Sequence, residues 1–79
     1  MPFGLDSLQN LDISFNKIEQ LTNDVFFYLR NLTDLLLNGN KIKFIKRDWF
    51  NGLKSLNFLY LQNNSLESIE SFKSLQINL

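Results

Sequence analysis

Aliphatic residues recur along the chain with a fixed spacing, and an asparagine recurs with them. Asn16, Asn40 and Asn64 are evenly spaced and define a 24-residue period. The sequence around each follows the pattern LxxLxLxxNxLxxL, with Leu or Ile at every aliphatic position. The three copies read LQNLDISFNKIEQL, LTDLLLNGNKIKFI and LNFLYLQNNSLESI. Self-similarity at a period of this length indicates a repeat architecture.

The middle of each copy predicts a short β-strand. Apolar and polar positions alternate there, as in Asn10-Leu11-Asp12-Ile13, which is typical of a strand with one buried face. A single strand of this kind cannot bury its aliphatic side chains. Stacking the copies about 4.8 Å apart would pair their strands in parallel and join the aliphatic side chains into one column. The chain must then return within one period to begin the next strand.

The repeated asparagine stands where the chain first turns away from the strand. An Asn side chain has two donors and an acceptor on a short stem, so it can satisfy backbone groups in its own turn and in the neighbouring coil. Leu lacks the polar atoms, and Asp would bury a charge. We therefore predict a structural asparagine ladder of Asn16, Asn40 and Asn64. The alternative is three exposed turn asparagines.

The returning limbs repeat as well. A Phe comes five residues after the last aliphatic position, and a Leu follows three residues later, which suits one turn of 3-10 or α-helix packing both inward. An Asp before each Phe is an expected N-cap. We expect Phe44 and Trp49 to cover the outside of this wall. The matching pairs are Phe26 and Phe50, Leu29 and Leu53, and Asp24 and Asp48.

Composition narrows the functions that are open to the chain. Its 79 residues contain sixteen Leu, eleven Asn, no Ala, no His and no Cys, and the formal charge is zero. We predict no catalytic residue, no metal site and no cofactor, because His, Cys and a phosphate-binding Gly loop are missing. The neutral balance argues against nucleic acid as a partner, and no apolar run reaches the ~20 residues of a membrane span. Asp12 and Asp34, the only carboxylates expected close together on the strands, are predicted to be solvated.

The pattern LxxLxLxxN, the Phe in the returning limb and the 24-residue period resemble the typical class of leucine-rich repeat (LRR). Segments such as LQNLDISFNKI and DWFNGLKSL are similar to those of Toll-like receptors and Slit-type extracellular proteins. The resemblance extends from about Leu5 to Ile69. It implies an α/β solenoid, a right-handed coil with a short parallel β-sheet on the concave face and mostly irregular or short 3-10 convex limbs.

The repeats divide the chain into one LRR segment, 1–79. It consists of a partial repeat 1–7 and the repeats 8–31, 32–55 and 56–79, the last with a shortened end that is out of phase. We expect a fragment of a longer array. Its uncapped ends would expose aliphatic side chains and allow self-association.

The resemblance implies a non-catalytic module that binds a protein ligand through the outward residues of its strands. Phe58 and Tyr60 are the strongest contact candidates, because aromatic side chains carry much of the energy of interfaces. The alternative is that they only favour a strand and pack on each other. This outward surface, called the strand face below, consists of Asn10, Asp12, Ser14, Asp34, Leu36, Asn38, Phe58, Tyr60 and Gln62.

By the same resemblance, the protein is expected outside the cell or on its surface, although the segment begins without a signal peptide. The alternative is an intracellular LRR scaffold or adaptor, which the missing cysteines would suit. Two N-glycosylation sequons begin at Asn31 and Asn63, and Asn31 is expected to be the more accessible. Four cations between Lys41 and Arg47 favour a solvated surface over a polyanion site.

Overall fold

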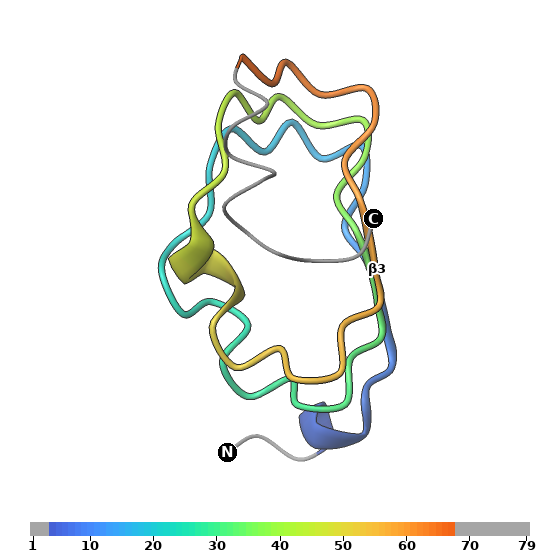
Figure 1. The fold of residues 1–79 in the computed structure, drawn as a ribbon. Coiled ribbons are helices and arrows are strands. Elements are labelled where there is room, and N and C mark those ends of the chain that lie inside the picture. Colours follow the sequence, from blue (N-terminus) through green and yellow to red (C-terminus); the bar gives the residue numbers. More distant parts are fainter. Residues whose placement is uncertain (1–3, 68–79) are drawn as a thin grey trace.

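The computed structural model describes residues 4–67 of the chain. Three short parallel strands form one sheet in the order β1-β2-β3: β1 spans Asn10–Asp12, β2 spans Asp34–Leu36 and β3 spans Phe58–Tyr60. Each strand residue pairs with its equivalent in the next repeat, as Leu11 pairs with Leu35 and Leu35 with Leu59. Figure 1 looks along the stack, so the successive coils overlap and the three strands lie behind one another. Paired strand residues are therefore one 24-residue period apart in the sequence.

Hydrogen bonds between coils continue beyond the strands. The Ile13 N–H donates to the Leu36 carbonyl at 3.0 Å, and the Phe15 N–H donates to the Asn38 carbonyl at 3.0 Å. The same two bonds recur one coil later, from Leu37 to Tyr60 and from Gly39 to Gln62. The coils thus remain in register from the strand into the following turn.

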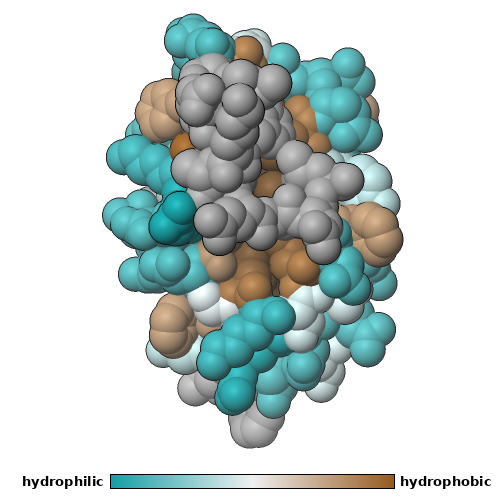
Figure 2. Space-filling view, viewed as in Figure 1, coloured by the Kyte–Doolittle hydropathy of each residue, from teal (hydrophilic) through white to brown (hydrophobic). Residues whose placement is uncertain are grey.

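The aliphatic column fills the space inside the coils. Figure 2 shows it as brown atoms in the middle of the molecule, with hydrophilic side chains around them. The second coil is the best buried, because it has a neighbour on both sides. In the first coil the equivalent positions are only half-buried, since no described coil precedes it. The fully buried aliphatic residues are Leu32, Leu35, Leu37 and Ile42, and the half-buried ones in the first coil are Leu8, Leu11, Ile13, Ile18 and Leu21.

The returning limbs are irregular apart from two short 3-10 helices, η1 at Leu5–Ser7 and η2 at Arg47–Phe50. Phe26 and Phe50 are both buried and their rings stack, with centroids 6.4 Å apart, so the predicted Phe column is confirmed. The sheet and the irregular limbs agree with the predicted solenoid, but residues 4–67 contain no α-helix, which corrects the α/β assignment. Only ten residues separate the last aliphatic position of one copy from the first of the next, as between Ile45 and Leu56, and the turns at both ends leave no room for a helix of several turns.

Two expectations for the limbs are wrong. Trp49 does not cover the outside, because it is 1 % exposed and belongs to the core. The aspartates are not N-caps either. Asp48 lies inside η2, whose N-cap is Lys46, and Asp24 adopts a left-handed conformation with φ 63°. The Asp24 carboxylate instead accepts a hydrogen bond from the Asn51 side chain at 2.8 Å, which ties two successive limbs together.

The residue before each repeated asparagine has a left-handed backbone. The φ angle is 57° at Phe15, 73° at Gly39 and 60° at Asn63. Gly and Asn adopt this conformation readily, but a Phe rarely does. A Cβ atom at Gly39 would overlap the Phe15 ring, so the glycine also makes room for that ring. This shared turn is a structural feature that the pattern of Leu and Asn does not indicate.

Candidate functional site

The sheet brings the residues of the strand face together in rows that cross the coils. Asn10, Asp34 and Phe58 form one row. Asp12, Leu36 and Tyr60 form the next row along the strands. The residues between these rows, such as Leu35 and Leu59, point into the core, as their burial shows.

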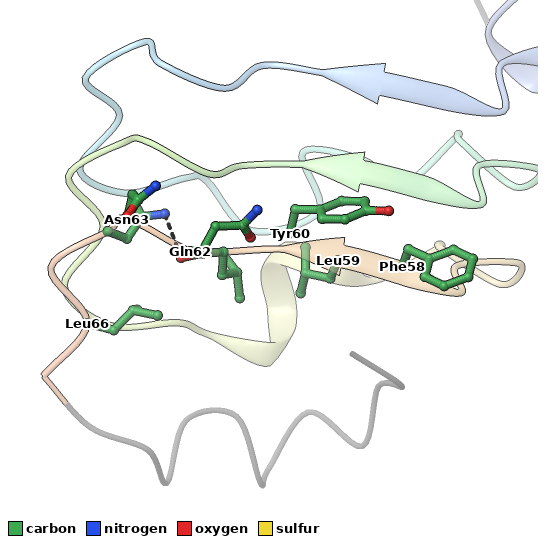
Figure 3. Close-up of a pocket in the computed structure, with 8 residues that line it drawn as sticks. Phe58, Leu59, Tyr60, Gln62, Asn63 and Leu66 are labelled. Atoms are coloured by element: carbon green, nitrogen blue, oxygen red, sulfur yellow. Dashed lines mark hydrogen bonds between the residues drawn. The ribbon is translucent and has the colours of Figure 1, made fainter.

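The aromatic end of the strand face lies on β3. Phe58 is 51 % exposed although it lies in a strand, and Tyr60 is half-buried. Their rings stack at 6.5 Å with an angle of 22° between their planes. Figure 3 shows both rings along β3, with Leu59 projecting to the other side of the strand. The stacking agrees with the alternative that the two rings pack on each other, yet it leaves Phe58 accessible to a partner.

The polar end of the strand face lies on β1. The Asp12 carboxylate accepts hydrogen bonds from the backbone N–H of Ser14, at 3.0 Å, and from its hydroxyl. These two bonds, the hydroxyl first, lower the pKa of Asp12 below its usual value of 3.8. On β2, the Asp34 carboxylate accepts a hydrogen bond from the Thr33 hydroxyl at 2.8 Å. Both carboxylates therefore have local partners, and the strand face carries negative charge at this end.

A third row of the strand face lies two residues beyond the ends of the three strands and contains Ser14, Asn38 and Gln62. Ser14 and Asn38 are half-buried, whereas Gln62 is exposed. The side-chain oxygen of Asn38 is buried and has no hydrogen-bond partner among residues 4–67. This row is therefore less open to a partner at its centre than the two rows on the strands.

The repeated asparagines differ in their surroundings. The Asn40 oxygen accepts hydrogen bonds from the backbone N–H groups of Asn16, at 2.8 Å, and Ile18, at 3.0 Å. Its amide group donates to the carbonyls of Leu37, at 2.9 Å, and Ile13, at 3.2 Å. Asn40 is 5 % exposed and is the one buried polar residue among those that the structure describes. Its side chain thus bonds to its own turn and to the preceding coil.

Asn64 repeats this arrangement one coil later. Its oxygen accepts from the Ile42 N–H at 3.0 Å, and its amide donates to the carbonyls of Leu37 and Leu61 at 2.9 and 3.0 Å. The bond to Leu61 is the dashed line in Figure 3. Asn16 differs, because its side chain is exposed and donates only to the nearby Ser14 carbonyl. With no described coil before it, Asn16 has no neighbouring backbone to bind.

The two sequons lie in different environments. The Asn31 side chain is exposed, but its amide nitrogen donates to the backbone carbonyl of Asp6. That nitrogen is the atom a glycan would occupy. In the same sequon, the single proton of the Thr33 hydroxyl is shared between the Asp34 carboxylate at 2.8 Å and the Gln9 carbonyl at 3.1 Å. Asn63 is exposed on a left-handed turn. The hydrogen bond of the Asn31 amide counts against the expected preference for this sequon, which stays a prediction.

The basic cluster does not form a uniformly positive surface. Lys43 occupies the same position in its coil as Glu19 and Glu67 do in the coils on either side. The Glu67 N–H donates to the Lys43 carbonyl at 2.8 Å, so the two residues lie next to each other. Lys46 instead lies over the Phe44 ring, 5.9 Å from its centroid. Acidic neighbours on both sides of Lys43 disfavour a polyanion site here.

Figure 3 also shows a pocket of about 510 Å³ along β3 and the turn that follows it. It is lined by Phe58, Tyr60, Asn63 and Leu66, among others. The last lining residue, Leu66, is followed by Glu67, where the described residues end, and no ligand is assigned to this pocket. The shortened third limb and the aliphatic residues expected at that end lie outside the described residues.

Sequence reasoning missed one group of exposed aromatic residues. Phe27 and Tyr28 are 50 % and 54 % exposed, directly after the buried Phe26. A signal for them was present in the sequence. Once Phe26 is assigned to the inward position by its match with Phe50, its two neighbours must point elsewhere.

Among residues 4–67, no helix is long and apolar enough to cross a membrane, and no cluster of three or more Asp or Glu side chains could hold a metal ion. The architecture of parallel coils with 24-residue register defines a repeat protein. The sequence model of the family described as leucine rich repeat matches residues 2–42 and 30–77, and the chain belongs to this family. No curated protein and no solved structure matches the chain.

Proposed function

We propose that this chain is a non-catalytic module that binds a protein partner through its strand face. Leucine-rich repeat domains generally mediate binding between proteins. The proposed contacts are the three rows described above, with the aromatic pair on β3 at one end and the two carboxylates of β1 and β2 at the other.

The observation that carries this proposal is the exposure of Phe58 on β3, although Phe58 pairs with Asp34 in the sheet. Phe58 lies beside Asp34, and Tyr60 lies beside Leu36. A strand residue that is 51 % exposed next to a half-buried Leu and a half-buried Tyr gives a continuous apolar surface. Such a surface bordered by polar residues is typical of protein interfaces.

We further propose a recognition protein of the receptor, adhesion or innate-immune type that acts outside the cell or at its surface, similar to Toll-like receptors and Slit-type proteins. The exposed sequon at Asn63 supports this location. An intracellular scaffold or adaptor would use the same strand face, and the choice between the two depends on which pool of proteins contains the partner.

The test compares three immobilised forms of the chain: the wild type, the double variant Phe58→Ser/Tyr60→Ser and the control Phe44→Ser. Phe44 is also an exposed aromatic residue, 43 % accessible, but it lies on a returning limb. Each form is incubated with secreted and cell-surface proteins and, separately, with cytosolic proteins, and bound proteins are quantified by mass spectrometry. We expect a partner from the secreted or surface pool that binds the wild type and the control equally.

For that partner, the double variant should bind about thirtyfold more weakly, which corresponds to the roughly 2 kcal/mol expected of a central aromatic contact. Circular dichroism of all three forms checks that folding is unchanged. A partner that binds the double variant as tightly as the wild type would refute the strand face as the binding surface. A partner found only in the cytosolic pool would favour the intracellular alternative.

A further inference from the structure

The exposed pair Phe27 and Tyr28 lies on a returning limb, away from the strand face. In Figure 1 the limbs run along the side of the coil opposite β3. The two rings meet edge to face, with centroids 5.4 Å apart. Both are about half exposed, so a large aromatic surface remains in water. The core does not need these rings, because Phe26 already fills the inward position of this limb.

A groove of about 560 Å³ lies beside the two rings, and we call it the limb groove. It is lined by Phe27, Tyr28, Arg30, Gly52 and Lys54. Tyr28 and Gly52 are one period apart, so they hold the same position in adjacent coils. Both residues line the groove, which therefore spans two adjacent coils. A volume of this size accommodates one or two large side chains of a ligand.

Close backbone contact fixes the floor of the limb groove. Gly52 has φ 91°, and a Cβ atom there would overlap the carbonyl oxygen of Phe27. Any other residue at this position would push the two limbs apart. The groove is therefore a fixed feature of how these coils stack rather than a gap between mobile side chains.

Two cations border the limb groove. Arg30 and Lys54 are also one period apart, so they stand in adjacent coils, and both are exposed. Within residues 4–67, neither side chain forms an ion pair. The residue at the same position in the partial repeat before these coils is Asp6, whose backbone carbonyl binds the Asn31 side chain. Two adjacent cations beside aromatic rings give this groove a positive edge and an apolar floor.

We propose that the limb groove binds an extended segment of a partner protein that carries an Asp or Glu next to a large apolar side chain. The carboxylate pairs with Arg30 and Lys54, and the apolar side chain covers Tyr28 and Phe27. The guanidinium group of Arg30 favours a carboxylate, which it can bind through two parallel hydrogen bonds. This second surface is independent of the strand face.

The charges on the chain favour an acidic peptide over a membrane or a nucleic acid. Two cations contribute about 1 kcal/mol each near an anionic lipid surface, which is too little for stable attachment. The chain as a whole has no net charge. It therefore lacks the broad positive field that collects nucleic acid. A short acidic segment needs only the local pair of cations.

The test begins with a phage-displayed library of random dodecapeptides, selected on the complete wild-type chain. The same selection is run on Arg30→Glu/Lys54→Glu and on the control Lys17→Glu/Lys41→Glu. The control makes the same change of charge at two exposed lysines that are also one period apart. We expect peptides with an acidic residue beside an aromatic or aliphatic one on the wild type and on the control, but not on the first variant.

The most enriched peptide is then synthesised with a fluorescent label, and its affinity is measured by anisotropy. We expect binding at least about tenfold weaker with Arg30→Glu/Lys54→Glu and with Tyr28→Ser, and unchanged with the lysine control, which fits one charge-assisted or aromatic contact. Binding should also be unchanged with Phe58→Ser/Tyr60→Ser, which separates this site from the strand face.

Three results would overturn the proposal. The first is a selected set with no more acidic residues than the unselected library. The second is equal affinity of the labelled peptide for the wild type and for Arg30→Glu/Lys54→Glu. The third is sedimentation of the wild type, but not of that variant, with vesicles of equal parts phosphatidylserine and phosphatidylcholine. That last result would assign the two cations to a lipid surface.

Discussion

Replacing Asn40 by Ala should strongly destabilise the protein, whereas replacing Asn16 should not. The Asn40 oxygen accepts from two backbone N–H groups, and its amide donates to two carbonyls. After truncation, the N–H of Asn16 can bond to water, because that residue is exposed. The Leu37 carbonyl keeps its second bond, from Asn64 at 2.9 Å.

The Ile18 N–H and the Ile13 carbonyl are then left without their partner, and both residues are half-buried. At about 1–3 kcal/mol for each unsatisfied group, with some access of water, the loss should be about 2–4 kcal/mol. A chain of this length has a total stability of roughly 4–12 kcal/mol. The substitution should thus remove between about a sixth and all of that stability. Asn16→Ala loses one exposed bond, to Ser14, and should cost no more than about 0.5 kcal/mol.

The assay is urea unfolding at 25 °C, followed by the fluorescence of Trp49, which is 1 % exposed and becomes hydrated on unfolding. With a slope of about 1 kcal/mol per molar urea, Asn40→Ala should lower the midpoint by roughly 2–4 M. An excluded osmolyte at one concentration in every sample can raise all midpoints into a convenient range. If Asn40→Ala and Asn16→Ala shifted the midpoint equally, with unchanged slopes, the buried amide would not be holding the coils together.

Two further predictions concern the contact between limbs at Gly52 and the acidic end of the strand face. Gly52→Ala should lower the free energy of unfolding, measured in urea, by at least about 2 kcal/mol more than Gly4→Ala does. Both glycines have positive φ, so both substitutions carry the roughly 1–2 kcal/mol cost of a left-handed residue. Only the Cβ at Gly52 would also clash with the Phe27 backbone. Equal losses would contradict the close contact. Ser14→Ala should raise the pKa of Asp12 toward 3.8, measured by NMR titration of the carboxyl carbon, since the hydrogen bonds that lower it are weakened. Because the pKa is lowered in the folded state, the stability from Asp12 is present above pH 3.8 and is lost as the pH falls through the lower folded value. An unchanged pKa in Ser14→Ala would show that the backbone bond alone sets it.

The register of the sheet could be predicted from the sequence, because the pairs such as Leu11 with Leu35 follow directly from the 24-residue spacing. The Phe column could be predicted for the same reason. The difference in burial between the first and second coils could not be predicted, because the spacing assigns Asn16 and Asn40 the same role. Their different burial depends on having a neighbour on one side or on both, which a repeated pattern does not contain.

The rows of the strand face also follow from the period, since residues of equal phase lie side by side. What the sequence could not provide is the detail of the limbs. Asp24 reads as an N-cap, but its left-handed backbone and its bond to Asn51 depend on contact with the next coil. The limb groove has the same origin, because it exists only where Gly52 comes to lie next to Tyr28. A repeat pattern aligns like residues, so it does not predict contacts between unlike residues in adjacent coils.

The bonds of the asparagine side chains between coils join residues 22 to 27 positions apart. Every such contact therefore closes a loop of nearly the same length, and the entropy lost in closing it is nearly the same for each coil. In an array built this way, further coils lengthen the chain without lengthening any loop that has to close. Folding speed, which depends on how far apart in sequence the contacting residues are, should then vary little with the number of coils.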